Sequence, residues 1–440
     1  MRSIAIFFFL LLAISCKQKD VEQQPGNLND AGYLNQSVIR LNDVVIYDIF
    51  SPPVASRVYA YSTLAAFEAS RWMDTSYPSL TAQLNGFPKM PEPDPGKTYD
   101  FRIAGIRAFF NITQKLTFSK DSSRITEEQI MKEMKVGVDN EVFRSSLSFG
   151  DAIAEAIWQR ALSDQYKEVQ GMARYSPSDL PGKWKVTPPD YLDAVQPFWT
   201  MMKPLVMDSS SQFKPVPPPP FSMDKNSQFY KEMMEVYDVS KNLTDSQKNI
   251  ARFWDDNAAA ITYKGHMMFA NKKPSPGGHW MNITAIAIRK TNLNWLQATQ
   301  AYALVAVSMY DAFISCWDEK FRSEYIRPVT AINEGFDKNW QPFLQTPPFP
   351  EYTSGHSVAS ATIAAMLTSI FGDNFAFTDD YELPYIGIQR DFPSFIKASE
   401  EACVSRLYGG IHYTSAIMNG RTQGRALGAY IVGKLRYKKI

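Results

Sequence analysis

The spacing of its apolar residues favours a helical fold for this chain. Apolar residues recur at i, i+3 and i+4 in the ranges 35–50, 55–73 and 145–166, which places them on one face of an α-helix. Thr126 with Gln129, and Thr244 with Gln247, have the spacing of capping boxes and predict two further helix starts. Runs that alternate apolar and polar residues, as half-buried strands do, are scarce. The pattern therefore predicts an all-α protein.

Proline-rich segments interrupt this helical pattern. The range 85–97 predicts a surface loop, and four consecutive prolines within 214–221 predict a stiff extended segment. We therefore expect an N-terminal helical half, residues 33–213, and a C-terminal helical half, residues 221–440, either as two domains or as one domain with a long strap. The range 291–310 lacks charge, but its asparagines and glutamines favour a buried core helix over a membrane span.

The first sixteen residues have the features of a processing signal. An apolar stretch over 4–14 is too short to span a bilayer as a stable helix. The run 12–16 ends in Cys16 like a bacterial lipoprotein cleavage site, and a polar tether follows at 17–32. An ordinary signal peptide or a helical anchor is the alternative. The lipoprotein interpretation predicts a lipid on Cys16 and attachment to the bacterial cell envelope, at its periplasmic or outer-membrane surface.

Charge and cysteine content exclude two other classes of protein. The chain has 46 basic and 45 acidic residues, so it lacks the surplus of positive charge that nucleic-acid-binding proteins carry. Besides Cys16, only Cys316 and Cys403 are present, which is too few for a disulfide framework. Both are expected to be buried as small apolar residues. The sequence does not predict an oligomeric state.

Three short motifs near the C-terminus gather residues that suit an oxyanion. They are Lys320 with Arg327-Pro328, then Ser354-Gly355-His356, then Ser405-Arg406 followed by His412. Lysine and arginine supply positive charge, and the planar guanidinium binds two oxygens at once. A hydroxyl, a glycine N–H and the start of a helix expected over 357–371 add donors. Singly, each residue has an ordinary explanation as a surface lysine, a helix end, a turn or a core histidine.

The joint order of these motifs resembles that of the superfamily of type 2 phosphatidic acid phosphatases and vanadium-dependent haloperoxidases. The resemblance implies an all-helical fold with the site in the core of a helical bundle. It further implies that the oxygens of vanadate or phosphate are held by Lys320, Arg327, Ser354, Gly355 and Arg406. By the same resemblance, His412 ligates vanadium or attacks phosphorus, and His356 is the acid–base residue.

Residues beside the motifs resemble bacterial members of this superfamily. Trp317, Asp318 and Phe349 are most similar to the pocket segments of vanadium iodoperoxidases from marine flavobacteria, and the resemblance places them at the halide. Two positions depart from the family pattern. Thr353 stands where proline is usual, and Ala416 stands where the phosphatases have an aspartate that orients the second histidine.

The resemblance implies a vanadium-dependent haloperoxidase that oxidises halide with hydrogen peroxide. Vanadate is then the cofactor and phosphate a competitor. Thr353 is expected to loosen its turn, and Ala416 to leave His412 without a carboxylate; both favour iodide over bromide and chloride. Two alternatives remain: an acid phosphatase that acts on a phosphomonoester through a phosphohistidine, and a lipoprotein that binds an oxyanion without turnover. Of the other histidines, His279 is expected to serve packing, and His266 has no visible partner.

Overall fold

The computed structural model describes residues 31–257, 260–264, 267–270 and 273–440 of the chain. Within these ranges nearly all regular structure is helical, and the prediction of an all-α protein is confirmed. The predicted signal, residues 1–16, most of the predicted tether and His266 lie outside the described residues. The first helix begins at Gly32, the last residue of the predicted tether.

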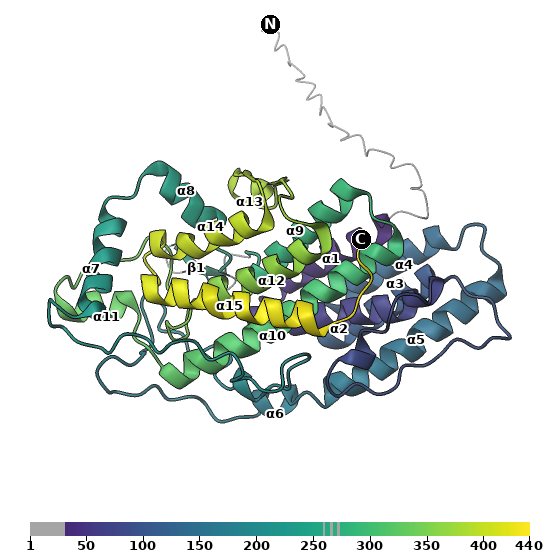
Figure 1. Ribbon diagram of the computed structural model, residues 1–440, viewed down its shortest axis with the longest axis horizontal. Coiled ribbons are helices and arrows are strands. Elements are labelled where there is room, and N and C mark those ends of the chain that lie inside the picture. The colour runs from purple at the N-terminus through teal and green to yellow at the C-terminus, as the bar shows by residue number, and fades with distance from the viewer. Residues whose placement is uncertain (1–30, 258–259, 265–266, 271–272) are drawn as a thin grey trace, which may run out of the picture.

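The helices of the N-terminal part of the chain lie mainly in one half of the molecule, with the shortest of them near its middle (Figure 1). These helices are α1 (Gly32–Tyr47), α2 (Pro52–Ser70), α3 (Phe101–Leu116), α4 (Lys120–Met134), α5 (Asn140–Leu162) and α6 (Tyr166–Gln170). Three single turns of 3-10 helix lie at Arg71–Met73, Thr81–Gln83 and Trp199–Met201. Thr126 lies inside α4 and its Oγ1 donates to the carbonyl of Ser122, so the helix start predicted there is wrong.

The C-terminal part contains the longest helix and two short hairpins. Its helices are α7 (Gln228–Lys241), α8 (Asp245–Phe253), α9 (Pro276–Thr291), α10 (Trp295–Ser323), α11 (Pro328–Gly335), α12 (Gly355–Phe371), α13 (Leu383–Ile386), α14 (Phe395–Tyr408) and α15 (Thr414–Lys434). The antiparallel hairpins pair β1 (Ile261–Lys264) with β2 (Met267–Ala270), and β3 (Phe377–Asp379) with β4 (Arg390–Phe392). Thr244 forms the predicted capping box at the start of α8, so that prediction is confirmed.

The uncharged range 291–310 belongs mainly to α10, which is buried along most of its length. Asn294 and Gln297 form a capping box that starts α10, while α9 ends at Thr291. The expectation of a buried core helix is therefore confirmed for 295–310. None of the helices in the described part of the chain is both long and apolar enough to cross a membrane.

Helix α10 connects the two expected halves of the chain. It packs against α2 of the N-terminal half and against α12 of the C-terminal half, and one hydrophobic cluster extends from Ala31 to Leu435. Helix α12 also packs closely on α15. A Cβ added at Gly424 would lie 2.3 Å from the Val358 carbonyl oxygen, so glycine is required for this close approach. The tight contact fixes the N-terminal end of α12 relative to the start of α15.

Candidate active site

The C-terminal ends of two helices and the starts of three others bring the three sequence motifs together. Lys320 lies in the last turn of α10, Arg327 is the N-cap of α11, and Ser354 is the N-cap of α12. Arg406 lies in the last turn of α14, and His412 precedes α15. All five side chains are buried. Residues almost a hundred positions apart in the sequence thus meet in one buried site.

Two of the buried cations are held in place by backbone carbonyls. Lys320 Nζ donates to the Pro350 carbonyl at 2.8 Å, and Arg327 donates to the carbonyls of Phe349 at 2.9 Å and Ile411 at 2.7 Å. Burial lowers the pKa of Lys320 to about 7 and that of Arg327 to about 10. Carbonyls orient these groups without cancelling their charge. An anion that binds here favours the protonated form of Lys320 and meets the positive charge of Arg327.

Arg406 is also held by backbone carbonyls. Its guanidinium donates to the carbonyls of Trp254 and Asp255, and burial lowers its pKa to about 10. Helix α14 and the segment after α8 therefore fix the third cation. The geometry gives three buried cations with fixed positions, which suits an oxyanion with several negative oxygens.

His412 is a neutral ring whose Nε2 faces the cations. Nδ1 lies 2.9 Å from Glu351 Oε1, and Nε2 lies 3.2 Å from Arg327 Nη1. A guanidinium only donates hydrogen bonds, so Nε2 is the acceptor and the ring proton lies on Nδ1, where it is donated to Glu351. Burial, together with Arg327, Lys320 and Arg406, holds the pKa of His412 well below its ordinary value. A lone pair on Nε2 is what a metal ligand needs.

Glu351 is the carboxylate that the sequence analysis missed. It supplies the partner for His412 that Ala416 does not, and its Oε1 also accepts from the Tyr413 N–H at 2.9 Å. Burial raises the pKa of Glu351 to about 8. The expectation that His412 has no carboxylate partner is therefore wrong. The sequence signal for this role was the position of Glu351. It lies two residues after Phe349, in a segment that resembles the pocket segments of bacterial haloperoxidases.

The turn before α12 is tied to two other helices. Thr353 Oγ1 donates to Gln423 Oε1 of α15 at 2.8 Å, and Gln423 Nε2 donates to Ser315 of α10. Ser354 Oγ accepts from the Ser357 N–H at 3.3 Å and caps the helix. The Tyr352–Thr353 peptide bond is cis. The expectation that Thr353 loosens this turn is therefore wrong, because its hydroxyl replaces the stiffness of proline with a side-chain bridge.

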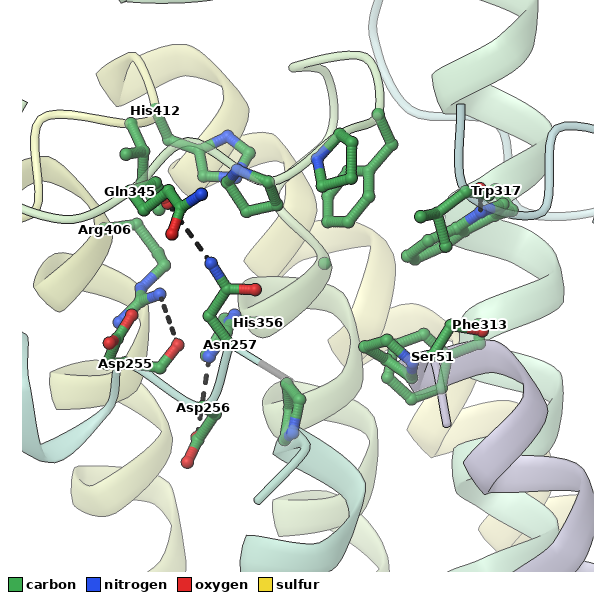
Figure 2. A pocket seen from close by; sticks show the side chains of 18 of the residues that line it. Ser51, Asp255, Asp256, Asn257, Phe313, Trp317, Gln345, His356, Arg406 and His412 are labelled. Carbon is green, nitrogen blue, oxygen red and sulfur yellow. Dashed lines mark hydrogen bonds and ion pairs between the residues drawn. The ribbon is translucent and has the colours of Figure 1, made fainter. Parts of the chain in front are cut away.

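His356 lies beside an acidic residue. Its Nε2 is 3.5 Å from Asp256 Oδ2, an ion-pair distance that is longer than a good hydrogen bond (Figure 2). Burial and the charge of Arg406 lower the pKa of His356 to about 4, although Asp256 opposes this shift. His356 is therefore a neutral base at neutral pH. Asp256 was not predicted from the sequence, because it lies 100 positions upstream of His356 and outside every motif.

A cavity of about 120 Å³ is lined by Gly355, His356, Arg406 and His412, while Lys320, Arg327 and Ser354 are not among its described lining residues. Figure 2 shows Arg406, His412 and His356 on one side of it and the rings of Trp317 and Phe313 on the other. Phe349 also lines it, and the N-terminal half contributes Ile49, Ser51, Pro52 and Val195. Asp318 is not among the described residues that line the cavity; its carboxylate accepts from the Thr200 hydroxyl at 2.8 Å.

The buried donors of the site fit an oxyanion such as vanadate. Within the described part of the chain, Arg327 Nη2 and His356 Nε2 are buried and have no hydrogen-bond partner. Buried polar groups are normally satisfied, so these atoms point to a bound group that offers oxygens. A hydroxyl, three cations and one neutral imidazole nitrogen form a donor set that matches vanadate or phosphate.

Comparison with known proteins places this arrangement in a family. Residues 300–438 match the model of the second helical-bundle domain of vanadium chloroperoxidase. The chain shares 43% sequence identity with a bacterial vanadium-dependent iodoperoxidase of known crystal structure. The two structures superpose with a TM-score of 0.89, over 95% of this chain and 100% of the iodoperoxidase chain. Holo and apo structures of a bacterial vanadium-dependent chloroperoxidase, 18% and 17% identical, have TM-scores of 0.69 and 0.66 over at least 90% of either chain and share the fold. No curated protein sequence matches the chain. The identity to the iodoperoxidase extends over nearly the whole of both proteins, and the chain therefore belongs to the vanadium-dependent haloperoxidase family.

Proposed function

We propose that this protein oxidises iodide with hydrogen peroxide, using vanadate as its cofactor. The observation that carries the proposal is the 43% identity to a bacterial vanadium-dependent iodoperoxidase over 95% of the chain. Vanadate, when bound, acts as a Lewis acid that activates hydrogen peroxide toward halide. The two alternatives considered from the sequence, an acid phosphatase and a non-catalytic oxyanion-binding protein, are not favoured by these relatives.

The residues of the site divide the work between binding and proton transfer. His412 Nε2, a neutral acceptor, would ligate vanadium, and Glu351 keeps the proton on the other nitrogen of the ring. Lys320, Arg327 and Arg406 balance the charge of the bound oxyanion, and Ser354 and Gly355 at the start of α12 orient its oxygens. His356 is neutral, so it accepts a proton from hydrogen peroxide and returns it as hypohalous acid forms.

Iodide is the halide that the cavity suits best. Iodide is large and polarisable and gives up water more readily than bromide or chloride, so it tolerates a wall of aromatic rings. Phe313, Trp317 and Phe349 form such a wall beside the oxyanion site. Iodide is also the easiest of the three halides to oxidise. Since Glu351 and Thr353 both stabilise the site, the preference now rests on this wall and on the relative, and no longer on a weakened site.

The test is a halide-oxidation assay after the vanadate-free protein has been loaded with orthovanadate. We expect iodide to be oxidised clearly faster than bromide, chloride to stay near background, and added phosphate to inhibit by competition for the same cations. A phosphomonoesterase assay runs beside it on the same protein without vanadate. Full activity in vanadate-free phosphate buffer, or hydrolysis of the phosphomonoester with no halide oxidation, would refute the proposal.

We also propose that the mature protein is anchored to the bacterial cell envelope by a lipid on Cys16. The support is the short apolar stretch that ends in Cys16 and the polar residues that follow it. The full-length chain should partition with membranes and be released by detergent, whereas a chain that begins at residue 17 should stay in the aqueous phase. Cys16→Ala in the full-length chain provides the matched control. Aqueous partitioning of the full-length chain, or membrane retention of the shortened chain, would contradict the anchor.

A further inference from the structure

We propose that His279 is a positioning residue of the active site. It binds one oxygen of Asp256 and so holds the other oxygen of that carboxylate beside His356. The inference rests on the proposed acid–base role of His356. Sequence analysis favoured a packing role for His279, and the haloperoxidase mechanism does not otherwise use it. The structure joins His356, Asp256, His279 and Asp379 in one buried chain of ionisable groups.

The geometry of His279 makes it a cationic link between two carboxylates. Nδ1 lies 3.0 Å from Asp256 Oδ1, and Nε2 lies 2.9 Å from Asp379 Oδ2. Ionised carboxylates only accept hydrogen bonds, so both ring nitrogens donate and the ring carries a positive charge. Although burial opposes that charge, Asp256 and Asp379 hold the pKa of His279 well above its ordinary value.

The ring of His279 is fixed by its surroundings as well as by its partners. The side chain is fully buried in the first turn of α9, and it stacks on Trp254 with ring centroids 4.6 Å apart. Tyr381 packs on it at 5.2 Å. Both nitrogens of His279 are hydrogen-bonded and Trp254 stacks on its ring, so the ring has little freedom to rotate. The Nδ1–H that donates to Asp256 therefore keeps a fixed position.

The charges around Asp256 explain why this link matters to His356. Asp256 faces His279 and His356, and burial together with the charge of Asp256 raises the pKa of the neighbouring Glu382 to about 8. Asp379 adds a third carboxyl group on the far side of His279. If His279 were neutral or absent, buried carboxylates would face one another without a cation, and one of them would take up a proton. His356 would then lose its anionic partner or the fixed position of that partner.

A divalent metal ion is the other arrangement that these groups could serve. Ligand atoms of Asp256, His279 and Glu382 lie within 4.8 Å of one another. Both nitrogens of His279 already have carboxylate partners, however, and the ion-pair chain accounts for them without a metal. Stoichiometric zinc, manganese or iron in the purified protein, lost in His279→Gln, would overturn the positioning role in favour of a metal site.

A double-mutant cycle on the vanadate-loaded enzyme separates a positioning role from a merely structural one. His279→Gln should lower kcat for iodide about 10- to 100-fold, the range usual for groups that orient a functional histidine, with vanadate affinity changed less than about 2-fold. In the His356→Ala background the same substitution should change kcat less than about 2-fold, because the group it acts through is gone. An equal loss in both backgrounds would overturn the proposal.

A second measurement follows the protonation state of the His279 ring in the vanadate-free protein. It therefore does not depend on halide turnover. The chain has only four histidines, so their ring signals can be assigned by NMR with labelled histidine. We expect one ring, absent in His279→Gln, to stay protonated on both nitrogens well above pH 7. Asp379→Asn, which keeps the shape of the site, should lower the pH at which that ring deprotonates. A His279 ring that is neutral at pH 7 would overturn the link, whereas absence of halide oxidation in wild type would refute the function alone.

Asp164→Asn supplies the control for lost stability. Asp164 is fully buried and pairs with Arg57 at 2.6 Å in the N-terminal half, away from the cavity. Its substitution should lower the melting temperature without lowering kcat for iodide in the folded protein. A loss of kcat in Asp164→Asn as large as in His279→Gln would show that buried ion pairs in general, and not the link to His356, limit turnover.

Discussion

The two histidines of the active site lie in opposite electrostatic surroundings. His412 meets three buried cations and a single carboxylate, whereas His356 lies beside Asp256 and the acidic groups behind it. Both rings are neutral, but the reasons differ. Positive charge and burial keep the proton off His412, while burial and Arg406 keep it off His356 against the pull of Asp256.

This difference suits each ring to the different task that we propose for it. A ligand must keep a lone pair, and burial with the neighbouring cations keeps Nε2 of His412 unprotonated while Glu351 accepts the hydrogen bond from Nδ1. An acid–base residue must take up a proton and release it, so it needs an anion nearby that stabilises its charged form. The acidic groups beside His356 supply that anion. The same residue type thus serves two roles because its neighbours differ.

The largest effect is expected when the ligand ring is removed. His412→Ala deletes the only side chain proposed to ligate vanadium, so vanadate binding and iodide oxidation should both fall to background. Equilibrium dialysis against orthovanadate and an iodide assay measure the two quantities separately. Because the three cations remain, weak phosphate binding should persist. Vanadate affinity close to that of wild type would show that the cations alone hold the oxyanion.

Removing the other ring should separate binding from turnover. His356→Ala should leave most vanadate binding while it lowers kcat about 100- to 10,000-fold, the usual contribution of a general acid–base residue. The same dialysis and iodide assay apply. If His356→Ala loses as much vanadate affinity as His412→Ala, the assignment of the two rings to different tasks fails.

Glu351→Gln tests the carboxylate that sets the proton on His412. The glutamine oxygen can still accept from His412 Nδ1 and from the Tyr413 N–H, so shape is kept, and above pH 8, where Glu351 is ionised, its charge is lost. We expect vanadate affinity to fall about 10- to 100-fold, as for other partners of metal-ligating histidines. Glu68→Gln, another buried carboxylate, should leave vanadate affinity unchanged. An unchanged affinity in Glu351→Gln would mean that a neutral acceptor suffices.

Much of this site could be predicted from the sequence because its residues occur in short motifs. Lys320, Arg327, Ser354, Gly355, His356, Arg406 and His412 all lie where the motifs place them, at the ends of helices that converge. Helical periodicity likewise predicted α1, α2 and α5 to within a few residues. A local sequence pattern is enough to predict a residue's position when that position depends only on its neighbours in the sequence.

The partners of these residues could not be predicted, because tertiary packing brings them in from elsewhere. Asp256 reaches His356 from the segment after α8, and Asp379 reaches His279 from β3. Ile49 and Val195, from the N-terminal half, complete the cavity wall. Glu351 was close to the motifs, but only the fold turns its carboxylate onto His412. Thr126 shows a different error. Thr126 and Gln129 have the spacing of a capping box, but both lie inside α4, which begins at Lys120.

The smallest expected effect is a pair of opposite pH dependences of stability. The pKa of His356 falls from 6.5 to about 4 on folding, so the unfolded chain binds more protons between these values and stability decreases as pH falls through that window. The pKa of His279 rises instead, so its contribution is present below about pH 6.5 and decreases as pH rises toward the raised pKa. Urea unfolding of the vanadate-free protein at pH 4.5 and pH 7.5 measures both.

His356→Asn should lessen the loss of unfolding free energy at the acidic pH, by at most about 3 kcal/mol for a shift of this size. His279→Gln should increase that loss, because it removes the one group of the pair that favours folding in acid. If both substitutions change the pH dependence in the same direction, the two rings do not lie in the opposed surroundings described here.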